Sequence, residues 1–71
     1  MAIFEVGSQV AWKGMGGKVK GEVRQIFTET IVMEIKGKNI KRLGTVKNPA
    51  YLVISKAGNY ALKLETELIP R

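Results

Sequence analysis

The spacing of the apolar residues is the feature that most constrains how this chain folds. Apolar and polar residues alternate with a period of two in several short segments, and glycine or other turn-forming residues separate these segments. This period places successive side chains on opposite faces of a strand, whereas an amphipathic helix needs a period near 3.6. No segment of useful length shows the helical spacing. The sequence therefore predicts an all-β domain.

Five or six short antiparallel strands are expected from this pattern. The clearest candidates cover residues 8–13, 18–27, 30–35, 51–55 and 60–64. Tight turns are predicted at residues 36–39 and 56–59, because glycine and asparagine tolerate the positive φ that hairpin turns require. No strand should run through Asn48-Pro49, since proline lacks a backbone donor. The last turn of the chain is expected to dock Leu68 beneath the sheet.

The long segment 18–27 is expected to bend. Its alternation predicts that Gln25 lies on the inward side and Ile26 on the outward side with the basic residues. An interior glycine such as Gly21 commonly marks a bend or a bulge. Only a two-residue link follows this segment, so segments 18–27 and 30–35 are predicted to be antiparallel neighbours.

The length of the chain limits how these strands can pack. With 71 residues there is room for one domain, residues 1–71, and a chain of this size buries only about 60% of the surface that its unfolded form exposes. Strands so few and short cannot build two stacked sheets, so a strongly bent sheet that closes on itself is predicted. A small SH3-like barrel is favoured over an OB-like barrel, because the OB fold usually has a helix between its strands.

Four stretches of the sequence are more specific together than any of them is alone. They are residues 6–12 (VGSQVAW), 16–23 (GGKVKGEV), 48–53 (NPAYLV) and 62–68 (LKLETEL). In this combination the chain resembles the hypervirulence-associated protein tudor-domain family. The resemblance covers nearly the whole chain and implies an SH3-like, tudor-type barrel. It implies no functional residues, because none is established for the family.

The residue types present leave little scope for catalysis. The chain contains no Cys, no His and no Asp. It therefore has no disulfide, no thiolate metal site and none of the side chains that most readily move protons near neutral pH. We predict a monomeric protein that is not an enzyme and that uses no cofactor and no metal. A cavity shared between the subunits of an oligomer is the remaining route to an active site.

The cellular location is inferred from what the sequence lacks. The first residues have neither the basic start nor the apolar run of a signal peptide, and no stretch approaches the about 20 apolar residues that a membrane span needs. Without cysteine, nothing indicates an oxidising compartment. We therefore expect a cytoplasmic protein that does not contact a membrane.

Positive charge is the feature that points most directly to a partner. Lys and Arg number 12 against 6 acidic residues, which gives a formal charge of +6. Residues 36–47 hold five of these cations and no acid. The candidate nucleic-acid-binding residues are this run, the cations of segment 18–24, and two tyrosines that could stack on bases: Lys18, Lys20, Arg24, Lys36, Lys38, Lys41, Arg42, Lys47, Tyr51 and Tyr60. We predict low-specificity binding of RNA or single-stranded DNA.

Alternatives to this interpretation stay open at the level of sequence. The same lysines could form a solvated edge that protects an unpaired strand from aggregation. The domain could instead be a protein- or peptide-interaction module with an acidic partner. Trp12 either packs in the core, as its alternation with Val10 predicts, or joins Tyr51 and Tyr60 in a cage for a methylated cation. The core position is favoured, because a domain of this charge repels the basic tails that carry such cations.

Overall fold

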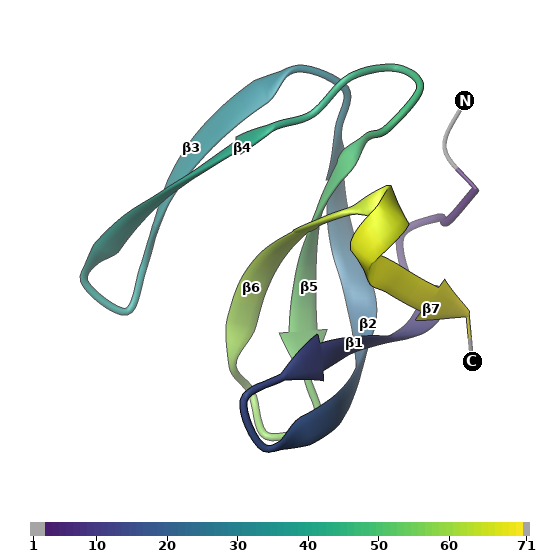
Figure 1. The fold of residues 1–71 in the computed structure, drawn as a ribbon, viewed down its shortest axis with the longest axis vertical. Coiled ribbons are helices and arrows are strands. Elements are labelled where there is room, and N and C mark those ends of the chain that lie inside the picture. The colour runs from purple at the N-terminus through teal and green to yellow at the C-terminus, as the bar shows by residue number, and fades with distance from the viewer. Residues whose placement is uncertain (1–2, 71) are drawn as a thin grey trace.

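The computed structural model describes residues 3–70, which form strands and one short helical turn (Figure 1). The elements in chain order are β1 (Gln9–Gly14), β2 (Gly17–Phe27), β3 (Thr30–Ile35), β4 (Lys38–Leu43), β5 (Ala50–Ser55), β6 (Tyr60–Leu64), the 3₁₀ turn η1 (Glu65–Glu67) and β7 (Leu68–Pro70). The all-β prediction is confirmed, with seven strands over residues 3–70 where five or six were expected.

The strands are arranged in two antiparallel sheets. The larger has the order β6-β5-β2-β1-β7, and β3 pairs with β4 in a separate hairpin, which stands as an arm beside β6 in Figure 1. Within residues 3–70 no ladder joins the two, so the sheet does not close into the expected barrel. The predicted pairing of segments 18–27 and 30–35 is also wrong, because β2 pairs with β1 and β5, and β3 pairs with β4.

A β-bulge changes the direction of the side chains in the second half of β2. The register with β5 shifts between Val23 and Gln25, so that Arg24 is the extra residue. An extra residue moves every later side chain to the opposite face of the sheet. Ile26 therefore packs against the core opposite Tyr51, while Gln25 is exposed. The sequence had predicted the reverse for both residues, because strict alternation cannot register a bulge.

Gly21 marks the place where β1, β2 and β5 come closest together. It pairs with Val10 on one side and with Ser55 on the other. A Cβ atom at this position would lie 2.1 Å from the carbonyl oxygen of Ile54 and 2.8 Å from the ring of Trp12. Only glycine allows this approach, so the predicted special role of Gly21 is a close contact between strands, and the bulge lies three residues further on.

The main core lies on one face of the five-stranded sheet, which we call the core face. Its buried cluster comprises Phe4, Val10, Trp12, Val23, Tyr51, Val53 and Leu68. Trp12 is only 5% exposed, which confirms the core position and excludes the cage alternative for this ring. The expected docking of Leu68 is also confirmed, since it pairs with Trp12 as the first residue of β7.

The opposite side of the sheet, the outer face, is divided into an apolar part and a basic part. Alternation places Ala11, Leu52 and Leu62 on this side, and all three are buried. Met33 and Ile35 of the β3–β4 hairpin approach Leu52. The hairpin therefore covers part of the outer face, which explains why this small domain can bury apolar residues on both faces of one sheet.

A two-residue turn closes the β3–β4 hairpin. Lys36 and Gly37 both have positive φ, 52° and 79°, as a type I′ turn requires. Asn39 already belongs to β4, where it pairs with Glu34. The turn is therefore shorter than the predicted segment 36–39, and it places Lys36 at the tip of the arm.

We predict that Gly21→Ala destabilises the domain by about 1–3 kcal/mol, because the new methyl group overlaps the backbone of Ile54, which cannot rotate away. The matched control is Gly16→Ala in the β1–β2 turn, where a Cβ meets nothing within 4 Å and the change should stay within about 0.5 kcal/mol. Urea unfolding of both variants measures the difference. Equal stability of the two variants would show that the strands do not meet closely at Gly21.

Candidate nucleic-acid interface

Two of the candidate binding residues, Lys18 and Lys20, lie on β2 and on the outer face of the sheet. Lys18 is directly opposite Lys13 of β1, and Lys20 is opposite Ala11. On the other side of β2, the backbone N–H of Lys56 donates to the carbonyl oxygen of Lys20 at 3.2 Å. This bond extends the β2–β5 register by one residue, so that Lys56 stands across from Lys20.

Four lysines therefore form one continuous row that runs from the first residue after β5 across β2 to β1. We call this row, Lys56, Lys20, Lys18 and Lys13, the basic face; all four are exposed. Side chains directly opposite each other have Cβ atoms about 5 Å apart, and those two positions apart along a strand are separated by about 6.6 Å. Positive charges thus follow one another at short intervals.

In the part of the chain that the structure describes, no ion pair joins an acid to the four lysines of the basic face, although Glu22 follows Lys20 on the same side of β2. The ion pairs there join Arg24 to Glu22 at 4.0 Å and Arg42 to Glu67, and neither involves the four lysines. Like charges directly opposite one another destabilise a sheet. Several unneutralised cations on one surface create a potential that attracts anions.

The two candidate arginines are both partnered. Arg24 is the bulge residue of β2 and lies beside Glu22. The guanidinium of Arg42 donates to Oε1 of Glu67 and so ties β4 to η1. Burial alone would raise the pKa of Glu67, but the N–H of Leu64 and the Arg42 guanidinium outweigh it and lower that pKa. Arg42 thus has a structural role that the sequence did not indicate.

The remaining candidate lysines do not join the basic face as a group. Lys36 and Lys38 flank the turn at the tip of the arm. Lys41 pairs with the exposed Val32 on the side of the hairpin that faces away from the sheet. Lys47 lies in the loop between β4 and β5. Lys41 and Lys47 therefore do not share a surface with Lys18 and Lys20, because alternate strand residues point in opposite directions and Lys47 lies in a loop.

The two tyrosines lie on opposite faces of the sheet and do not stack together. Tyr51 pairs with Lys63 on the core face and is 0% exposed. Its ring meets Phe4 edge-on, with centroids 5.5 Å apart. The prediction that Tyr51 contacts a base is wrong, because no ligand can reach it. Tyr60 pairs with Ile54 on the outer face and is 44% exposed.

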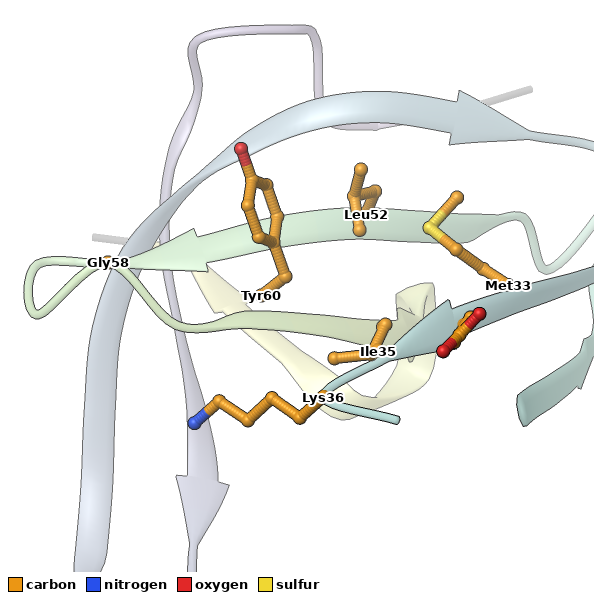
Figure 2. A pocket seen from close by; sticks show the side chains of 7 residues that line it. Met33, Ile35, Lys36, Leu52, Gly58 and Tyr60 are labelled. Atoms are coloured by element: carbon orange, nitrogen blue, oxygen red, sulfur yellow. The ribbon is translucent and has the colours of Figure 1, made fainter. Parts of the chain in front are cut away.

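A half-open pocket of about 400 Å³ lies between the arm and the β5–β6 hairpin. Its lining residues are Met33, Glu34, Ile35, Lys36, Leu52, Gly58 and Tyr60. In Figure 2 the Tyr60 ring stands beside Leu52, and Met33 and Ile35 approach from β3. Lys36 extends toward the side where Gly58 lies, and Gly58 belongs to the same turn as Lys56. The pocket therefore adjoins one end of the basic face.

Some of these features were missed by the sequence reasoning. Lys13 and Lys56 lie outside the acid-free run, and only the register of β1, β2 and β5 brings them beside Lys18 and Lys20. Ile31, Met33 and Ile35 alternate with more polar or exposed positions in segment 30–35, and this alternation predicts an apolar face for the arm. It could not show that this face leaves a pocket against β5 and β6.

Within residues 3–70, no group of three or more acidic, His or Cys side chains is arranged to hold a metal ion. No helix in this part of the chain is long and apolar enough to cross a membrane.

Comparison with known proteins agrees with the fold. The family model described as "Hypervirulence associated proteins TUDOR domain" matches residues 7–68. The chain belongs to this family. The resemblance inferred from the sequence is thus confirmed, and the tudor-type fold identifies the protein as a small binding module, a class that is generally not enzymatic. No curated protein and no solved structure gives a significant match to this tudor domain.

Tyr51 provides a test of the packing beneath this interface. Burial, and then the hydrogen bond that its hydroxyl donates to Glu65 Oε1 at 2.7 Å, raise the pKa of Tyr51 to about 12. The folded state therefore holds this proton more tightly than the unfolded state does, whose Tyr pKa is about 10. The stabilisation is complete below pH 10 and decreases as the pH rises toward 12.

We predict that the free energy of unfolding of the wild type falls more steeply between pH 10 and pH 12 than that of Tyr51→Phe, with a difference of up to about 2–3 kcal/mol. All other side chains are the same in both proteins, so the difference isolates Tyr51. Urea unfolding at several pH values in this range measures it. Parallel pH profiles would contradict a buried, hydrogen-bonded Tyr51.

Proposed function

We propose that this tudor domain binds nucleic acid with low sequence specificity, through phosphate contacts on the basic face. The observation that carries the proposal is the register: Lys13 stands directly opposite Lys18, and Lys56 stands across from Lys20. Such pairs are unfavourable in the free protein. A bound polyanion relieves the repulsion, because each lysine then has a phosphate as its neighbour.

The position of Lys20 in the sheet argues against the edge-protection alternative. Lysines protect a sheet from aggregation when they lie on an unpaired edge strand. β2 pairs with β1 over residues 17–22 and with β5 from Gly21 onward, and Lys56 adds one bond at Lys20. Lys20 therefore has a bonded neighbour on both sides, whereas Lys18, which the β5 ladder does not reach, and Lys41 on the arm both fit edge protection.

The shape and chemistry of the basic face favour a chain of anions over a single one. The row runs from the β5–β6 turn across β2 to β1, so its charges are spread along a line and do not converge on one point. Lysine is a flexible point charge that contacts phosphate without reading the edges of bases. This predicts binding that depends strongly on salt and little on sequence.

We predict that the wild type binds a labelled oligonucleotide with a dissociation constant on the order of 10⁻⁴ to 10⁻⁶ M at physiological salt. A plot of the logarithm of the binding constant against the logarithm of the salt concentration should have a slope of about −3 for four phosphate contacts. Lys18→Glu/Lys20→Glu should abolish most of this binding. Lys41→Glu/Lys47→Glu changes the net charge equally but lies off the basic face, and should bind nearly as the wild type does. Fluorescence anisotropy at several salt concentrations measures all three proteins.

Two results would contradict the proposal. Equal weakening in both double variants would mean that net charge, and not the basic face, attracts the oligonucleotide. Absence of oligonucleotide binding by the wild type, with binding of an acidic peptide that Lys18→Glu/Lys20→Glu abolishes, would favour the protein-interaction alternative.

A further inference from the structure

The pocket beside Tyr60 has a position and a chemistry that the phosphate contacts of the basic face do not use. Its walls come from two separate units, the arm and the β5–β6 hairpin. Gly58 contributes to the wall and lies two residues after Lys56, at the end of the lysine row. A ligand that lies along the basic face and continues past Lys56 therefore reaches the pocket.

We propose that this pocket takes one unstacked nucleobase, so that the protein prefers single-stranded to duplex nucleic acid. The inference rests on the proposed function and specifies its substrate. Tyr60 supplies an aromatic ring and is 44% exposed as a residue, and aromatic side chains stack on bases of any sequence. The thioether of Met33 and the aliphatic side chains of Ile35 and Leu52 supply the apolar surroundings that a base accepts.

The polar groups of the pocket suit a base attached to a phosphate chain. The ammonium group of Lys36 provides donors for the edge of a base. Lys36 also brings a positive charge to the side of the pocket near Gly58. The pocket has a volume of about 400 Å³, which is within the range of small-ligand sites. Because it is half open, the sugar and phosphate can remain outside.

The same features disfavour the ligand usual for an aromatic cage. A methylated ammonium is held over the faces of aromatic rings, and this pocket contains one ring, that of Tyr60. The ammonium group of Lys36 would repel a second cation there. In duplex nucleic acid the bases are paired and stacked, so only a single strand can offer a base to this pocket without an unpairing cost.

The experiment compares a short labelled oligothymidylate with a labelled duplex of the same length, using the wild type, Tyr60→Ala and Tyr60→Phe. The wild type should bind the single strand more tightly. Tyr60→Ala should weaken single-strand binding about tenfold, as expected from the loss of one base stack, and should leave duplex binding and the salt slope unchanged. Tyr60→Phe keeps the aromatic face and should bind as the wild type does.

A second measurement avoids dependence on the folding of the variants. In the NMR spectrum of the wild-type protein, the ring protons of Tyr60 should shift upfield when the single strand is added, and they should not shift when the duplex is added. The ring protons of the buried Tyr51 should not shift with either probe.

The outcomes separate this inference from the proposed function. The first outcome is that single strand and duplex bind equally, that Tyr60→Ala changes neither affinity, and that Lys18→Glu/Lys20→Glu still abolishes binding. This outcome would overturn the base pocket and would leave the proposed role of the basic face intact. If the wild type binds neither probe, both are overturned.

Discussion

The close approach of β1, β2 and β5 at Gly21 is the constraint on which the rest of the structure depends. The Ile54 carbonyl and the Trp12 ring both occupy the space that a side chain at Gly21 would need. This contact fixes the register of the central strand against both of its neighbours. A slip of one residue would turn every side chain of a strand to the other face, and it would direct Lys18 and Lys20 toward Trp12. The core and the basic face are therefore two consequences of one register.

Local features of the fold could be predicted from the sequence, whereas the choice of strand partners could not. Period-two alternation and turn residues gave strands close to their observed bounds, the β5–β6 hairpin, and the burial of Trp12. The bulge at Arg24 leaves no local signature, and it reversed the expected directions of Gln25 and Ile26. β3 pairs with β4 and not with β2, although the end of β2 that precedes it, residues 25–27, is paired only with β5. The pattern of residues along each segment does not decide this choice of partner.

The candidate site was predicted only in part for the same reason. Lys18, Lys20, Lys36 and Tyr60 were among the expected residues and lie on or beside the basic face. The density of positive charge along the chain placed Lys41 and Lys47 among the candidate binding residues. They do not lie on the basic face, because residues that are neighbours in sequence face different directions in strands and loops. The same charge density missed Lys13 and Lys56, which become neighbours of the others only through pairing. Tyr51 shows that an aromatic residue in a strand more readily completes a core than a binding surface.

The central claim is that one face of the sheet, and not the overall charge, binds nucleic acid. Amide chemical shift mapping during titration with a single-stranded oligonucleotide tests this claim most directly. The account predicts that the largest shifts occur at Lys13, Lys18, Lys20 and Lys56, extend to Tyr60, and weaken with added salt. Shifts centred on Lys41 and Lys47, or spread evenly over all exposed lysines, would contradict it.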